Sequence, residues 1–122
     1  MQTRDQKYAV DVYKRVTQVK DENRNSYGSM AHKLPILIRT AGLAQALAFV
    51  ESKAKNKAAL KQLLNDLSET VDKPGILIET ARTAPLSEYM LLTQQTLAAL
   101  LWYKRFAQSI LDIQAGDEEE GK

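Results

Sequence analysis

Apolar residues are spaced as in a helix through most of this 122-residue chain. They recur at every third or fourth position, and no segment alternates with a period of two over the length of a strand. Residues 76–78 (Ile-Leu-Ile) would also suit a strand, but we interpret them as part of a short helix. The pattern predicts helices over about residues 4–20, 27–41, 43–54, 57–71, 76–84 and 87–113. We therefore predict an all-α fold, a compact single-domain bundle of about five to six helices with a long C-terminal helix.

The ends of the predicted helices carry local signals. Ser26 and Asn56 are suited to cap helix N-termini, and Gly42 suits the left-handed residue that follows a helix C-terminus. Pro35 falls inside the second helix, where the apolar spacing continues past it, so we expect a kink at this point. The first helix is predicted to bury one set of apolar residues: Ala9, Val12, Tyr13, Val16 and Val19.

Charge is distributed unevenly along the chain. Residues 1–60 carry 11 Lys and Arg against 5 Asp and Glu, a net charge of +6, whereas residues 61–122 carry 6 against 10, a net charge of −4. A basic half of this kind can attract nucleic acid, although it is also compatible with an ordinary solvated surface. We predict one helical domain over residues 1–116 and an acidic disordered tail over residues 117–122.

The composition argues against a membrane protein and against an enzyme. The N-terminus is too polar for a signal peptide, and no apolar run approaches the roughly 20 residues of a membrane span. The chain has no cysteine, and its one histidine, His32, is predicted to lie at the surface or at a helix end. Paired carboxylates on an apolar face and a glycine-rich phosphate loop are also lacking. We expect a cytoplasmic, non-catalytic protein that binds no metal or cofactor.

Basic residues beside apolar surface remain the main candidates for function. Arg39 lies on the flank of an apolar helix face, where it either bonds helix-end carbonyls at the Gly42 corner or holds an external anion. Lys104 and Arg105 directly follow Trp102 and Tyr103, a combination typical of nucleic-acid surfaces, although such aromatic residues more often belong to a core. The candidate RNA-binding residues are Lys14, Lys20, Arg24, Lys33, Arg39, Lys104 and Arg105. Residues 97–103 are apolar nearly all round, and the candidate subunit contacts there and one turn further on are Leu101, Trp102 and Phe106.

Two segments resemble a known family. Residues 34–39 (LPILIR) with 42–49 (GLAQALAF), and residues 100–107 (LLWYKRFA), are similar to two blocks of the small subunit of type III-B CRISPR effector complexes. The resemblance implies an all-helical, non-catalytic subunit whose copies stack head to tail. It also implies that these copies line the groove that holds the guide RNA–target RNA duplex and contact mainly the target strand. The partners would then be the other subunits, further copies of the chain, and the guide and target RNA.

Two alternatives stay open. A protein-binding helical adaptor would use residues 97–103 and bind its partner even at high salt. A helix-turn-helix DNA-binding regulator would use the two helices that meet at Gly42. The second alternative is weaker, because the helix after Gly42 offers only Gln45 in its first turns to contact base edges.

Overall fold

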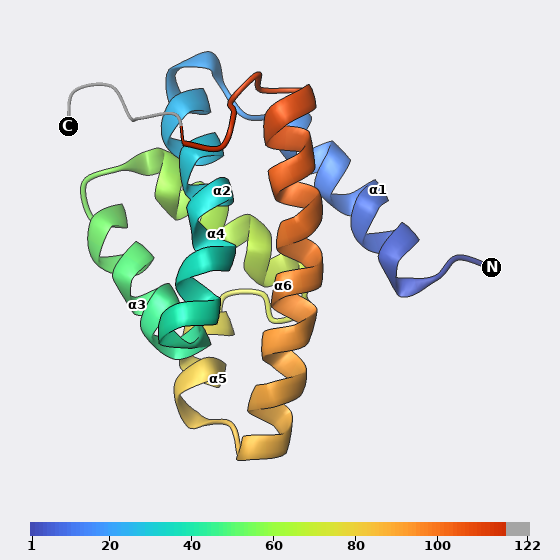
Figure 1. The fold of residues 1–122 in the computed structure, drawn as a ribbon, viewed down its shortest axis with the longest axis vertical. Coiled ribbons are helices and arrows are strands. Elements are labelled where there is room, and N and C mark those ends of the chain that lie inside the picture. The colour runs from blue at the N-terminus through green and yellow to red at the C-terminus, as the bar shows by residue number, and fades with distance from the viewer. Residues whose placement is uncertain (117–122) are drawn as a thin grey trace.

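This computed structural model describes residues 1–116, which contain six α-helices and one short 3₁₀ helix. The elements are α1 (Arg4–Thr17), η1 (Asp21–Asn23), α2 (Arg24–Ala41), α3 (Leu43–Ala54), α4 (Ala58–Thr70), α5 (Leu77–Thr83) and α6 (Leu86–Ser109). α2 and α6 pack along each other, α1 lies against α6 on one side, and α3 and α4 lie against α2 (Figure 1). The prediction of an all-α fold with a long C-terminal helix is confirmed, and the segment around residues 76–84 is the helix α5. The tail predicted at residues 117–122 lies outside the described residues.

The first helix is shorter than predicted and buries a different face. The Thr3 hydroxyl accepts a hydrogen bond from the Gln6 N–H, and Gln6 Oε1 accepts one from the Thr3 N–H, so a capping box starts α1. The helix ends at Thr17 instead of about residue 20. Its buried residues follow an i, i+4, i+8 series, namely Tyr8, Val12 and Val16. The prediction was right for Val12 and Val16 but wrong for Tyr13, which is 53% exposed at the rim of this face. Ala9 and Val19 are half-buried.

The second and fourth helices begin at residues other than the predicted caps. α2 starts at Arg24, so Ser26 lies within the helix and Arg24 belongs to its first turn instead of a loop. The N-terminal flanking residue of α4 is Lys57 instead of Asn56, and it makes no side-chain capping bond. α2 continues through Pro35 to Ala41, as the apolar spacing predicts.

Gly42 forms the tight corner between α2 and α3. Its φ of +90° is a backbone conformation that favours glycine, although its ψ of 159° differs from that of a left-handed helical residue. The Gly42 N–H donates to the Ile38 carbonyl, and its own carbonyl accepts from the Ala46 N–H. The Tyr89 hydroxyl accepts a hydrogen bond from the Ala44 N–H at 3.1 Å. The start of α6 therefore lies against the α2–α3 corner.

The end of α6 differs most from the prediction. The helix stops at Ser109, and the following residues fold back over α2, so that Leu111 and Ile113 are buried. Gly28 makes this close approach possible, because a Cβ atom there would lie only 2.8 Å from Ile113 Cγ1. The same segment covers His32, which is 4% exposed and whose Nε2 lies 2.8 Å from the Ile113 carbonyl oxygen. The prediction of a surface histidine was wrong, because residues outside α2 cover this side of the helix.

Candidate nucleic-acid interface

A network of polar side chains joins α1, α2, α4 and α6, and no sequence motif indicated it. Arg15 Nε donates to Asp11 Oδ2 at 2.9 Å, and Arg15 Nη2 donates to Glu69 Oε1 at 3.2 Å. Arg15 Nη1 also lies 3.7 Å from Asp66 Oδ1. One cation thus faces three carboxylates from two helices. Because Arg15 is neutralised in this way, it is poorly suited to bind a phosphate.

The same network extends into the core through hydroxyl groups. The Tyr27 hydroxyl donates to Asp66 Oδ2 at 2.7 Å, and Thr70 Oγ1 lies 2.7 Å from both Asp11 Oδ2 and the Tyr103 hydroxyl. Burial raises the pKa of Tyr27 and of Tyr103, so both hydroxyl groups stay protonated. These groups satisfy one another, and the network therefore holds helices together instead of forming a reactive site.

Two of the three carboxylates of this network, Asp66 and Asp11, respond to it differently. Burial raises the pKa of Asp66, and the hydrogen bond from Tyr27 and the charge of Arg15 oppose this rise only in part. Burial also acts to raise the pKa of Asp11, but the hydrogen bonds from Arg15 and Thr70 outweigh it, so the pKa is lowered.

The candidate RNA-binding cations are accessible but do not form one cluster. Lys14, Lys20, Arg24, Arg39 and Arg105 are exposed, and Lys33 and Lys104 are half-buried. None of the seven forms an ion pair with a carboxylate of residues 1–116. Because Tyr89 marks the α2–α3 corner, Arg39 lies near the start of α6. Lys104 is fifteen residues further along, about 22 Å at 1.5 Å per residue. The cations are therefore spread over the length of the bundle.

The sequence left two roles open for Arg39, a bond to the helix-end carbonyls of the Gly42 corner or contact with an external anion. Its side chain makes no hydrogen bond to any other described residue, so it does not bond the helix-end carbonyls of the Gly42 corner. The Tyr89 hydroxyl contacts this corner instead. The guanidinium group of Arg39 therefore has no hydrogen-bond or ion-pair partner among residues 1–116.

The aromatic residues of α6 are only partly available for a partner. Tyr103 is fully buried. Trp102 donates from Nε1 to Asp5 Oδ1 at 3.0 Å and stacks on Phe106 at 5.6 Å between ring centroids. Phe106 in turn meets Tyr13 edge-on, at 5.5 Å between ring centroids. Among the predicted subunit contacts, Leu101 is exposed, whereas Trp102 and Phe106 are half-buried beside α1.

Two apolar surfaces lie toward opposite ends of α6. The first, which we call the α1 groove, is lined by Ala9, Val10, Tyr13, Lys14 and Phe106. The second, the α6 patch, contains Leu86, Met90 and Leu91, which are 73%, 55% and 51% exposed. The exposure of the α6 patch could not be predicted from the sequence, because its residues fit the apolar spacing of a buried helix.

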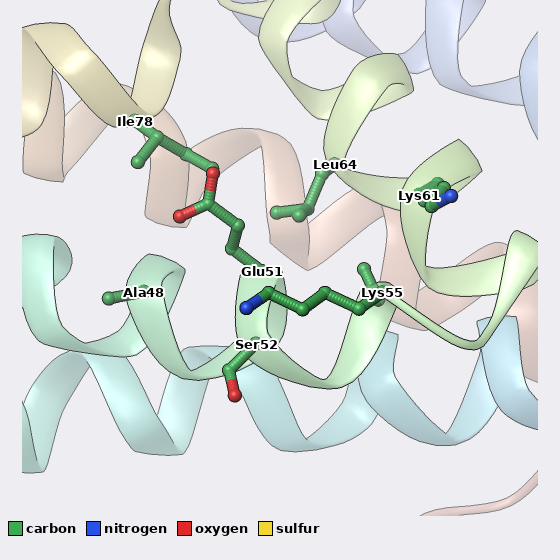
Figure 2. Close-up of a pocket in the computed structure, with 8 residues that line it drawn as sticks. Ala48, Glu51, Ser52, Lys55, Lys61, Leu64 and Ile78 are labelled. Carbon is green, nitrogen blue, oxygen red and sulfur yellow. The ribbon is translucent and has the colours of Figure 1, made fainter.

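A third feature lies at the turn between α3 and α4. Lys53, Lys55, Lys57 and Lys61 gather within nine residues, and we call this set the lysine corner. Beside it, a groove of about 510 Å³ runs between α3, α4 and α5 (Figure 2). In Figure 2, Lys55, just after α3, and Lys61, in α4, border this groove, and Glu51 extends toward Ile78. The density of lysine was visible in the sequence and would have identified this surface.

Residues 1–116 contain no group of three or more histidine, aspartate or glutamate side chains placed to hold a metal ion. Within the same residues, no helix combines the length with the apolar character that a membrane crossing requires.

Comparisons with known proteins agree on one family. The family model described as CRISPR-associated protein (Cas_Cmr5) matches residues 4–110, which include all six α-helices. The CRISPR system Cmr subunit Cmr5 of Thermus thermophilus is 46% identical over 115 residues, covering 92% of this chain and 99% of that protein. The crystal structure of a CRISPR-associated Cmr5 family protein from the same species matches with a TM-score of 0.82 and 46% identity. That match covers 89% of this chain and 98% of the other.

Proposed function

The chain belongs to the Cas_Cmr5 family of CRISPR-associated proteins, and from this membership we propose that it is the non-catalytic small subunit of a type III-B CRISPR effector complex. In this role it stacks with further copies along the guide RNA–target RNA duplex and contacts the target-strand backbone. Its other partners are the remaining subunits of the complex.

The availability of its cations is the observation that supports RNA binding most directly. The seven candidate cations form no ion pair within the described residues, whereas Arg15 faces three carboxylates. Unpaired lysine and arginine side chains neutralise phosphates without reading sequence. This suits a subunit that follows a duplex whose sequence is read by base pairing to the guide. The spread of the cations along the bundle likewise suits an extended backbone better than a single ligand.

The two apolar surfaces support stacking of copies. The α1 groove and the α6 patch lie toward opposite ends of α6 and differ in composition. A contact between two different surfaces of the same chain is heterologous, and it extends into a row instead of closing into a symmetric dimer. Exposed apolar clusters of this kind mark protein contacts more often than solvated surface.

A protein-binding adaptor is the second candidate, because the same apolar surfaces favour it. It differs from the first proposal in one measurable respect, the contribution of phosphate contacts. Binding through apolar surface survives high salt, whereas binding through phosphates weakens as salt rises. A DNA-binding role for the α2–α3 corner has less support, because α3 packs Leu43, Leu47 and Val50 into the core.

Purification of the native chain with its partners tests the proposal. The larger subunits and a guide RNA are expected to come with it. A variant with Arg39, Lys104 and Arg105 changed to glutamate should then retain less target RNA in the assembled complex, although its helical content is unchanged. A triple reversal at Lys7, Lys73 and Arg82 provides the matched control. Equal retention of target RNA by both folded variants and the unaltered chain would contradict the proposed RNA contact.

A further inference from the structure

The lysine corner has the highest density of positive charge in the chain, and the proposed function does not use it. Residues 52–65 contain four lysines and no aspartate or glutamate. Lys53, Lys55 and Lys61 are exposed, and none of these three forms an ion pair with any carboxylate of residues 1–116. Like charges held this close repel one another, so an anion bound among them lowers the electrostatic free energy.

The fold brings these lysines together from two helices. Lys53 belongs to the last turn of α3, Lys55 follows that helix, and Lys61 lies in the first turns of α4. Lys55 and Lys61 border the groove between α3, α4 and α5 together with the Ser52 side chain (Figure 2). Glu51 lines the same groove, so its walls carry two cations and one carboxylate.

An exposed aromatic ring lies beside one of these lysines, Lys53. Phe49 is 43% exposed on α3, and Lys53, one turn further along, places its Nζ 5.2 Å from the centre of the Phe49 ring. Residues four apart share a helix face, so a ligand that reaches Lys53 also meets the ring. Proteins that bind single-stranded nucleic acid combine cations for the phosphates with an aromatic ring on which a base stacks.

We propose that the lysine corner binds an unpaired segment of RNA, with Lys53, Lys55 and Lys61 contacting phosphates and Phe49 stacking on a base. The proposal rests on the proposed function, because that function places RNA beside the chain, and it adds a surface and a single-stranded form of the ligand. An acidic protein would satisfy the lysines equally well but has no base to stack on Phe49. The exposed ring therefore favours RNA.

Binding of a fluorescent uridine oligonucleotide to the full chain, measured over a series of salt concentrations, tests this inference. Changing Lys53, Lys55 and Lys61 to glutamine should weaken binding and reduce the slope of log K against log salt by about 2, since each contact with a single strand contributes about 0.7. Phe49→Ala should weaken binding about tenfold and leave the slope unchanged, because stacking is not ionic. The same variant should change binding of a duplex RNA little, because the bases of a duplex are already stacked.

Matched variants provide the controls. Changing Lys7, Lys73 and Arg82 to glutamine removes the same charge away from every candidate RNA contact, and Tyr13→Ala removes another exposed ring. The inference is wrong if these controls lose affinity for the oligonucleotide while the corner variants do not. It is also wrong if polyglutamate competes with the oligonucleotide for the chain and Phe49→Ala changes neither the affinity for the oligonucleotide nor the affinity for polyglutamate. Both results leave the proposed function intact, because that function is judged by the target RNA retained in the assembled complex.

Discussion

Gly28→Ala is expected to destabilise the protein, although alanine is the better helix former. Gly28 lies inside α2, and a Cβ atom there would stand 2.8 Å from Cγ1 and 2.9 Å from Cβ of Ile113. In an unobstructed helix the substitution would stabilise the fold by about 1 kcal/mol. Here the new methyl group must displace the segment that follows α6.

The expected magnitude follows from the contacts of that segment. Ile113 is 4% exposed, and its displacement costs about 1.5–3 kcal/mol of apolar burial. The hydrogen bond between His32 and the Ile113 carbonyl is also lost, at about 1 kcal/mol. After the gain in helix propensity is subtracted, the free energy of unfolding should fall by about 2 kcal/mol.

Urea denaturation followed by circular dichroism measures this change, and a second background isolates its cause. Ile113→Gly removes the obstructing side chain but keeps the carbonyl that His32 contacts. In that background Gly28→Ala should stabilise the protein by up to about 1 kcal/mol, so the sign of its effect reverses. A stabilising effect of Gly28→Ala in the unaltered chain would refute this account of the close approach.

Two further predictions concern the polar network and the α6 patch. Asp11→Asn should reduce the loss of stability in acid. The folded-state pKa of Asp11 is lowered, so the contribution of its carboxylate to the free energy of unfolding is present above the ordinary pKa of 3.8. That contribution is lost as the pH falls through the lower folded value. Urea denaturation over a pH series measures this, and an unchanged acid dependence would contradict it. Changing the exposed Met90 and Leu91 to glutamine should leave the free energy of unfolding within about 0.5 kcal/mol but reduce association between copies, as measured by analytical ultracentrifugation. Unchanged association would exclude the α6 patch as a stacking surface.

The candidate site was predictable in part. The seven cations were predicted from their residue types and positions and stay a prediction; five of them are exposed, and none forms an ion pair within residues 1–116. The spread of these cations along the bundle was not predictable, because it depends on how α2 packs along α6. The ion pairs of Arg15 with Asp66 and Glu69 could not be predicted either, since more than fifty residues separate Arg15 from these partners in the chain.

The helices follow from local features of the sequence, because helix formation depends on apolar spacing and on local residues such as the Thr3 cap and Gly42. Which side chains those helices bury depends instead on how the helices pack. His32 lies on the polar side of its own helix and is covered by Ile113, eighty-one residues later. Tyr13 fits the apolar spacing of its helix but lies at the rim of the face that buries Tyr8, Val12 and Val16, where its ring meets Phe106 edge-on. Burial depends on what packs against a helix, and residues distant in the chain supply those contacts.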